Sequence, residues 1–309
     1  MNINGIQIDD TFAEAFNMRA TRVIITAHNH KWAYHAANAM TGFATSVIGC
    51  GVEAGIEREL PADETPDGRP GISILMFAMG SKVLIQQLET RMGQCILTCP
   101  TAAAFAGIES REGLEVEPIN LGKNLRYFGD GFQTSKLISG KRYWRIPVMD
   151  GEFLVQESTG MVRAIGGGNF LILATSQEAA LNAAETAIEA MQNIPNVIMP
   201  FPGGVVRSGS KVGSKYPSMF ASTNDAFCPT LKGLTKTELG DDIESVQEIV
   251  IDGLSYGDIA KSMKVGIEAI CALNKNGAKK SGVKRISAGN YGGKLGPHHF
   301  KLHEILGEK

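Results

Sequence analysis

The sequence lacks the features that mark membrane-spanning and nucleic-acid-binding proteins. Its longest apolar run, residues 72–78, is interrupted only by Ser73, and it is far shorter than the roughly 20 apolar residues that cross a bilayer. Lysine and arginine nearly balance aspartate and glutamate, so the formal net charge is only -2. Such a chain has no basic field to hold a nucleic-acid backbone or an anionic membrane surface. We therefore expect neither nucleic acid nor membrane as a partner.

Cysteine is scarce, and no signal peptide is recognisable. The five cysteines include no Cys-x-x-Cys pair, a pattern that is typical of reduced thiols in a cytoplasmic protein. The opening residues, MNINGIQIDDTF, are acidic and carry no basic region followed by an apolar stretch, so they do not resemble a signal peptide. We expect a soluble, cytoplasmic protein without disulfides.

Histidine is also scarce, which argues against a metal-dependent enzyme. The six histidines fall in two places along the chain: His28, His30 and His35, and then His298, His299 and His303. Paired histidines at the end of a strand, such as His28 and His30, can bind a catalytic metal. That kind of site needs more ligands along the chain than are found here. We expect surface or supporting histidines and no bound metal.

Glycine, in contrast, is abundant and clustered. The chain has 36 glycines in 309 residues, clearly more than the usual ~7%. Clustered glycine indicates tight backbone turns, often where the chain approaches a ligand. With 43% apolar and 20% charged residues, the chain can bury a sizeable core, and its length predicts roughly two domains.

Hydrophobic periodicity predicts a strand, helix, strand unit four times. The segments are, in chain order, 21–27, 30–40 and 43–48; 71–78, 81–92 and 94–98; 161–174, a helix from Ser176 and 197–206; and 246–251, a helix capped by Ser255 and 283–287. The last two helices share Ile-Glu-Ala, at 188–190 and 267–269, and both units end in a loop of glycine, serine and lysine. This equal placement favours a duplicated unit.

Two units in each half make a split βαβ arrangement. We therefore expect an α+β protein with two ferredoxin-like α/β sandwich lobes built from split βαβ units. The predicted lobes are residues 1–158 and 159–309, and the first carries an insertion at about 100–157 with strands at 125–128, 143–148 and 152–156.

Several polar loops are candidate binding sites. Consecutive backbone N–H groups beside a lysine can hold a carboxylate or phosphate, although each loop could equally be an ordinary turn. Neither glycine cluster fits a nucleotide motif, because 49–55 has one residue too many for the dinucleotide fingerprint and 204–211 reads Gly-Ser-Lys where Gly-Lys-Ser/Thr is needed. The candidate residues are Ser210 and Lys211, Asn290 and Lys294 in the duplicated loops, Asp67 and Arg69 in ETPDGRPG, and Asn224 and Asp225 in STNDAFCP.

One carboxylate stands out in the segment SVQEIVIDG, residues 245–253. Strand alternation puts Val246, Glu248 and Val250 on one face. If that face is buried, desolvation raises the pKa of Glu248 and allows it to hold a proton near neutral pH. The alternative is an edge strand on which Glu248 meets water.

Many separate segments, in order, resemble one known family. They are TFAEAF, ETPDGRPG, RMGQC, FGDG, GGGNF, PFPGGVV, SGSKVGSK, ASTNDAFCP, QEIVIDGL and KRISAGNYGGKLG. Together they closely resemble the formylmethanofuran:tetrahydromethanopterin formyltransferase family, and the likeness runs from the first residues to about His303.

The resemblance implies an acyltransferase of one-carbon metabolism. It implies reversible transfer of a formyl group between formylmethanofuran and N5 of tetrahydromethanopterin, with the two carriers as co-substrates and no tightly bound cofactor. It further implies two α/β lobes, a homotetramer with clefts at subunit contacts, and a catalytic glutamate at Glu248. Such enzymes occur in methanogenesis and in formaldehyde oxidation by methylotrophic bacteria, where the protein resembles one component of a formyltransferase/hydrolase complex. A metal-dependent formyl-amide hydrolase and a non-catalytic scaffold subunit remain as alternatives.

Overall fold

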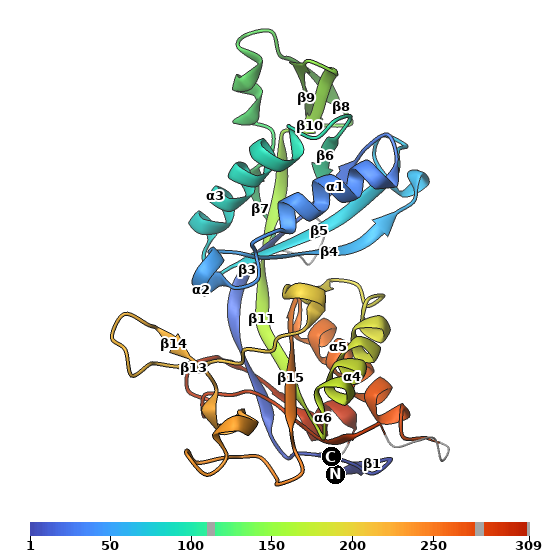
Figure 1. Cartoon of the computed structure of the whole chain (residues 1–309). Coiled ribbons are helices and arrows are strands. Elements are labelled where there is room, and N and C mark those ends of the chain that lie inside the picture. The colour runs from blue at the N-terminus through green and yellow to red at the C-terminus, as the bar shows by residue number, and fades with distance from the viewer. Residues whose placement is uncertain (110–114, 276–280, 308–309) are drawn as a thin grey trace. The chain divides into compact units, whose positions relative to one another are not determined.

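Two long strands, β3 (Phe12–Thr26) and β11 (Ser158–Ala174), carry the chain from one compact unit to the other (Figure 1). The computed structural model describes residues 1–109, 115–275 and 281–307. Unit 1 contains residues 1–17 and 165–309, and unit 2 contains residues 18–164. The first residues of the chain therefore belong to the same unit as its carboxyl-terminal part. The lobe boundary expected at residues 158 and 159 falls within β11 and stays a prediction.

The sheet of unit 2 is built on both sides of β3. On one side β3 pairs antiparallel with β5 (Gly71–Ala78), which pairs antiparallel with β4 (Glu53–Leu60). On the other side β3 pairs antiparallel with β6 (Ala103–Ala106). The remaining strands extend from these: β10 (Gly151–Gln156) is parallel to β6, β9 (Lys141–Val148) and β8 (Thr134–Ile138) follow antiparallel, and β7 (Glu117–Asn120) pairs with β11.

Helices α1 (His30–Thr41) and α3 (Ser81–Arg91) pack on β5. The side chain of Asn29 starts α1 by accepting a hydrogen bond from the Trp32 backbone N–H at 3.2 Å, which satisfies one of the free donors of the first turn. Alternate residues of β5 and the inward residues of both helices form the core of unit 2: Ile72, Ile74, Met76, Ala78, Ala33, Ala36, Ala37, Met40, Leu84 and Leu88.

Three strand predictions in unit 2 are wrong. Residues 43–48 form no strand, because Ser46 caps a short helix, α2 (Val47–Cys50), and Gly51 ends it with a φ of 77°. Residues 94–98 instead continue α3 as a π-helical turn, η2 (Met92–Ile96), which buries Met92 and Ile96. Residues 125–128 lie in a 3₁₀ turn, η3 (Leu125–Gly129), that Asp130 closes with a φ of 50°. Segments 143–148 and 152–156 are strands as predicted, and residues 110–114 of the insertion lie outside the described residues.

The sheet of unit 1 is centred on β11. It pairs antiparallel with β15 (Ser245–Gly253) on one side and with β16 (Val283–Ser287) on the other. β12 (Val197–Ile198) extends the sheet beyond β15, and β2 (Ile6–Ile8) lies parallel to β16 and pairs with β1 (Asn2–Ile3). β17 (His298–Lys301) pairs antiparallel with the first residues of β3 and leads into α6 (Leu302–Leu306). A separate hairpin joins β13 (Lys211–Val212) to β14 (Ala221–Ser222).

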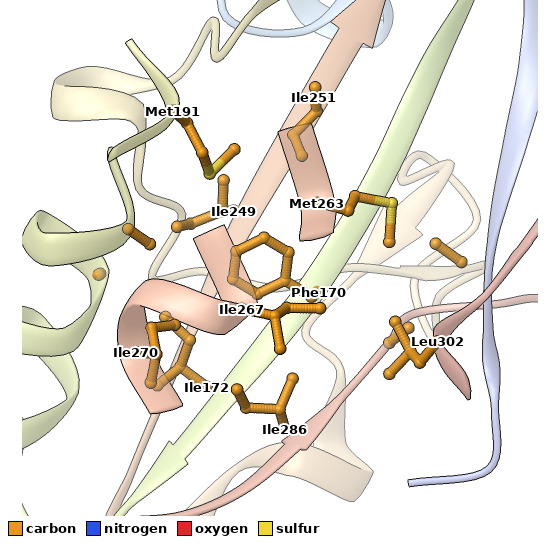
Figure 2. Packing of buried hydrophobic residues seen from close by; sticks show 14 of the residues in the cluster. Phe170, Ile172, Met191, Ile249, Ile251, Met263, Ile267, Ile270, Ile286 and Leu302 are labelled. Atoms are coloured by element: carbon orange, nitrogen blue, oxygen red, sulfur yellow. The ribbon is translucent and has the colours of Figure 1, made fainter. Parts of the chain in front are cut away.

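Helices α4 (Gln177–Met191) and α5 (Tyr256–Ala272) pack together and against β15. Figure 2 shows the apolar side chains that β11 and β15 direct toward them. Burying such side chains contributes about 1.5 to 3 kcal/mol each. The labelled members of this core are Phe170, Ile172, Met191, Ile249, Ile251, Met263, Ile267, Ile270, Ile286 and Leu302.

Most of the predictions for unit 1 are confirmed. Ser176 and Ser255 cap α4 and α5 by accepting hydrogen bonds from backbone N–H groups, each at 3.1 Å, and segments 161–174, 246–251 and 283–287 are strands. The strand expected at 197–206 is wrong in most of its length, because only β12 forms. Pro200 and Pro202 have no N–H for a ladder, and Gly203 turns the chain with a φ of 62°.

The structure is mixed α/β with largely antiparallel strands, which is consistent with the expected α+β class. In the part of the chain that the structure describes, no helix combines the length and apolar character needed to cross a membrane.

Candidate active site

Glu248 lies in the middle of β15, between two other backbone segments of unit 1. It is directly opposite Leu171 of β11, and on its other side it exchanges two backbone hydrogen bonds with Val206, at 2.7 and 2.9 Å. Directly opposed residues in antiparallel pairs share a face of the sheet. The Glu248 side chain is therefore flanked by Leu171 and Val206, which are only 4% and 6% exposed.

The two faces of β15 have different surroundings, as the alternation predicted. Ile249 and Ile251 belong to the core under α4 and α5. Val246 packs instead against a smaller apolar cluster formed by Leu171, Leu173, Leu239 and Ile243. Glu248 shares the second face, so its side chain points away from the helices and not into the main core.

A small cavity of about 40 Å³ opens at this face of the strand. Polar and apolar side chains both line it. Its lining residues are Glu248, Gln247, Arg207, Ser208, Asn224 and Cys228, together with Leu171, Val206, Gly209, Phe227 and Val246.

Burial raises the pKa of Glu248 to about 7. The residue as a whole is partly exposed, but its carboxyl group is desolvated between apolar neighbours, and desolvation disfavours the ionised form. Near neutral pH a substantial fraction of Glu248 therefore carries a proton. A carboxylic acid in this state can donate a hydrogen bond or transfer a proton during a reaction.

Tyr291 lies within electrostatic reach of this carboxyl group. Burial raises the pKa of Tyr291, the negative charge of Glu248 raises it further, and a side-chain hydrogen bond with Ser210 lowers it. The effect of Glu248 shows that the two side chains are within electrostatic reach of each other. Ser210 was predicted as a binding residue, and the structure brings it to this phenol.

Lys211 and Asp225, both predicted as binding residues, form an ion pair. Lys211 Nζ lies 2.5 Å from Asp225 Oδ1, and this hydrogen bond lowers the pKa of Asp225. The pair joins the β13–β14 hairpin to the loop that carries Asn224. A large part of the Lys211 charge is therefore balanced within the protein.

Asn224 and Asn290 line one larger cavity of about 750 Å³ in unit 1. Asn224 also lines the cavity at Glu248, so it borders both spaces. The amide of Asn290 is engaged within the protein, because its Nδ2 donates to Thr11 Oγ1 and to Phe12 O, each at 3.2 Å. Lys294 follows Asn290 in the same loop and is exposed.

Asp67 and Arg69 belong to unit 2 and contact each other. Arg69 Nε donates to Asp67 Oδ2 at 2.8 Å, and the Thr26 hydroxyl donates to the same oxygen at 2.8 Å. Arg69 Nη1 also donates to Thr101 O at 2.6 Å. These contacts fix the loop at the end of β3, and the predicted binding role of both residues stays a prediction.

Groups of three or more histidine, cysteine, aspartate or glutamate side chains that could hold a metal ion are not found in residues 1–109, 115–275 and 281–307. This finding does not test the prediction that His28 and His30 are surface or supporting histidines.

Two family models cover almost the whole chain. The model described as "Formylmethanofuran-tetrahydromethanopterin formyltransferase" matches residues 1–148, and the model described as "FTR, proximal lobe" matches residues 151–305. The chain belongs to the formylmethanofuran–tetrahydromethanopterin formyltransferase family. The resemblance carried by the sequence segments is thereby confirmed.

Relatives of the family match over their full length. The formylmethanofuran–tetrahydromethanopterin formyltransferase of Methylobacillus flagellatus is 75% identical over 99% of this chain and 100% of that protein. A solved structure of the formyltransferase/hydrolase complex of Methylorubrum extorquens with methylofuran superposes with a TM-score of 0.94 at 50% identity, covering 100% of this chain and 99% of that one. The formyltransferase of Methanosarcina barkeri superposes with a TM-score of 0.91 at 46% identity, covering 99% and 100%.

Two further residues of unit 1 were not singled out from the sequence. Tyr291 stands in the glycine-rich loop, and Glu14 stands in a strand among apolar residues, in the same pattern as Glu248. That pattern was the available signal for Glu14. Its hydrogen-bond partners begin 277 residues later in the chain, so no local feature could show them.

Proposed function

We propose that this protein reversibly transfers a formyl group between formylmethanofuran and N5 of tetrahydromethanopterin, in a ternary complex with both carriers. The names of full-length relatives support the reaction, and the relative from Methylobacillus flagellatus is 75% identical. The observation that carries the chemistry is the desolvated carboxyl of Glu248 beside a cavity, with its pKa raised to about 7. We assign Glu248 as the catalytic residue.

The reaction exchanges one carbon–nitrogen bond for another. The N5 amine of the acceptor attacks the formyl carbon, the formyl oxygen gains negative charge, and a tetrahedral intermediate forms. The carbon–nitrogen bond to the donor then breaks, and the departing nitrogen takes a proton while the new formamide loses the one that the attacking amine brought. Holding both carriers in place supplies orientation, which is worth on the order of 7 to 11 kcal/mol in favourable cases.

A protonated Glu248 fits two steps of this sequence. It can hydrogen-bond the formyl oxygen as charge develops, or it can protonate the departing amine nitrogen, and groups in such roles contribute about 10² to 10⁴ in rate. The apolar neighbours Leu171 and Val206 keep water away from the reacting group. This matters because a tetrahedral intermediate open to water can end in hydrolysis.

The other predicted residues are proposed to bind the carriers. Lys211, Lys294 and Ser210 hold anionic tails, and the remaining polar side chains hydrogen-bond polar parts of the carriers: Asp67, Arg69, Asn224, Asp225 and Asn290. The shared lining of two cavities by Asn224 supports its place among them. The internal contacts of Asn290, Asp67 and Arg69 suit a role in shaping loops as well as in binding.

The metal-dependent hydrolase and the scaffold subunit are not favoured, since full-length relatives are named for transfer between the carriers. We further propose a cytoplasmic homotetramer of one-carbon metabolism, acting in methanogenesis or formaldehyde oxidation without a tightly bound cofactor. Association with other proteins is supported by a relative from Methylorubrum extorquens that is 52% identical and is named as one of the subunits of a formyltransferase/hydrolase complex.

We propose that both units are ferredoxin-like, although they depart from the predicted strands. In unit 1 the order β16-β11-β15-β12, with α4 and α5 in the connections, supports a split βαβ arrangement. In unit 2 the order β6-β3-β5-β4, with α1 and α3 in the connections, supports the same arrangement.

The function is tested by incubating purified protein with formylmethanofuran and tetrahydromethanopterin. We expect formyltetrahydromethanopterin to appear as formylmethanofuran disappears, and we expect the Glu248→Gln variant to lose most of the turnover. Glu244→Gln is the matched control, because it removes an exposed carboxylate four residues earlier that lies 3.7 Å from Lys232. Release of free formate with bound zinc would support the hydrolase, and absence of any turnover would support the scaffold.

A further inference from the structure

Glu14, near the start of β3, is a buried carboxylate that the proposed reaction does not yet use. It is 1% exposed, and its two oxygens accept hydrogen bonds from four backbone N–H groups of a single loop. Oε2 accepts from Tyr291 at 2.7 Å and from Gly293 at 2.8 Å. Oε1 accepts from Leu295 at 2.6 Å and from Gly296 at 2.7 Å.

These donors keep Glu14 ionised. Burial by itself raises the pKa of the carboxyl, but the four backbone N–H groups lower it more strongly, to about 2. A carboxylate that accepts several backbone hydrogen bonds is stabilised in its charged form. Glu14 therefore has no proton to donate at any ordinary pH. Its function is to bind the loop as a fixed anion.

The loop is held against β3 and β11 along its length. Asn169 of β11 clamps Gly289, because Asn169 Oδ1 accepts from the Gly289 N–H at 2.6 Å and Nδ2 donates to the Gly289 carbonyl at 3.2 Å. At the other end, a Cβ atom on Gly296 would clash with the Ala15 carbonyl oxygen. Only glycine allows this approach, so the loop and the strand are shaped for each other.

The side chain that this loop carries toward the site is Tyr291. Its ring lies 6.0 Å from the ring of Phe16, centre to centre. Ser210 and the charge of Glu248 both act on the pKa of its hydroxyl, so both side chains lie in its neighbourhood. Between the anchored residues, the loop thus places a phenol within electrostatic reach of the carboxyl that we assign to catalysis.

We propose that Glu14 is a positioning residue for formyl transfer, which acts by holding the loop of residues 289–296 so that Tyr291 stays within electrostatic reach of Glu248. The proposal rests on the function proposed above. Burial raises the pKa of Tyr291, so it keeps its hydroxyl proton at working pH and offers an O–H donor within electrostatic reach of Glu248. Without Glu14, four N–H groups lose their acceptor and Tyr291 is no longer fixed.

A double-mutant cycle tests this dependence through kcat and KM for both carriers. We expect Glu14→Gln to lower kcat about 10-fold or more; KM for a carrier should rise as well, by about 10-fold at most, because the same loop carries the proposed binding residues Asn290 and Lys294. We expect Tyr291→Phe to lower kcat by a similar factor. If Glu14 acts through Tyr291, the double variant is no more than about 2-fold slower than the slower single variant.

The control is Glu57→Gln in unit 2. Glu57 is also a buried carboxylate, and it accepts hydrogen bonds from Arg22 Nε at 2.7 Å and from Ser73 Oγ at 2.7 Å. We expect this change to lower the melting temperature and to leave kcat within about 2-fold of the unchanged protein when assayed below that temperature.

The outcomes separate the two proposals. If the unchanged protein transfers formyl groups and Glu14→Gln does so equally well, the positioning role is overturned and the function stands. Multiplicative losses in the double variant also overturn it, because they mean that Glu14 acts independently of Tyr291. If Glu14→Gln does not fold, Gly293→Ala replaces it in the cycle, since the φ of 71° at Gly293 makes alanine distort the loop while Glu14 stays in place. Absence of transfer by the unchanged protein contradicts the function itself.

Discussion

Glu14 and Glu248 lie in the same unit, each on a strand with apolar neighbours, yet their surroundings move their pKa values in opposite directions. Burial raises the pKa of Glu248 to about 7. Burial also acts on Glu14, but four backbone N–H groups lower its pKa to about 2. Burial alone therefore does not determine whether a glutamate holds its proton. The hydrogen-bond donors around the carboxyl decide whether it serves as a proton donor or as a fixed anion.

The largest expected effect is on the rate of Glu248→Gln. The amide keeps the shape of the side chain but cannot supply a proton, so we expect kcat to fall by about 10² to 10⁴ with little change in KM. Steady-state kinetics with both carriers measure this. If kcat of the variant stays within a factor of about two of the unchanged protein, the raised pKa of Glu248 has no catalytic use.

The next expected effect is on the pH dependence of kcat. Because we propose the protonated form of Glu248 as the active one, kcat should fall as pH rises through about 7, by roughly tenfold per pH unit beyond it. Glu14, which is ionised throughout, should contribute no inflection between pH 5 and 9. A profile that stays flat from pH 6 to 9 in the unchanged protein, or the same descending limb in Glu248→Gln, is incompatible with this assignment.

The two substitutions should change stability in opposite directions at pH 8. The pKa of Glu248 is raised by folding, so the carboxyl favours the folded state at low pH and opposes it as pH rises through about 7. Replacing it by glutamine should therefore stabilise the protein above pH 7, by about 1 to 3 kcal/mol at most. The pKa of Glu14 is lowered by folding, so its stabilisation is present above the ordinary range of glutamate and is lost as pH falls toward about 2.

Glu14→Gln should accordingly destabilise the protein at pH 8, by about 1 to 3 kcal/mol, because buried N–H groups lose an acceptor. Melting temperatures at pH 8 and pH 5 measure both variants. If both substitutions destabilise the protein to the same extent at pH 8, Glu248 and Glu14 cannot be distinguished as a proton donor and a fixed anion.

The smallest expected effects concern the two lysines of the glycine-rich loops. Lys211→Ala and Lys294→Ala should each raise the KM of a carrier, by about 3- to 10-fold, with little change in kcat, since they remove uniform binding. Lys211 should show the smaller effect because Asp225 already balances its charge at 2.5 Å. Asp225→Asn is the variant for comparison, because it removes the carboxylate that balances the charge of Lys211. Unchanged KM values for both carriers in both alanine variants would refute the binding role.

The fold was predictable where the pattern is local. Ser176 and Ser255 cap their helices as expected, and the alternation around Glu248 is confirmed by the separate surroundings of Ile249 and Val246. The wrong strands at 43–48 and 94–98 have apolar residues too, but a serine cap and a continued helix decide their structure. Short apolar runs do not distinguish strand from helix by periodicity alone.

The site was predictable only in part, because its geometry depends on distant contacts. The desolvation of Glu248 requires Leu171 and Val206 on neighbouring segments. The anchoring of the loop that carries Tyr291 requires Glu14, whose partners lie 277 to 282 residues further along the chain. Lys211 was predicted to bind an anionic group because of its place in a glycine-rich loop, and its ion pair with Asp225 depends on the fold of the intervening hairpin.

The protonation state of Glu248 can be followed by difference infrared spectroscopy, with the Glu248→Gln spectrum subtracted at each pH. A carbonyl stretch of a protonated carboxyl that disappears with a midpoint near pH 7 is the result we predict. A midpoint near the ordinary glutamate value of about 4.3, or the absence of such a band at pH 6, would contradict the role of Glu248 as the proton-holding acid of formyl transfer.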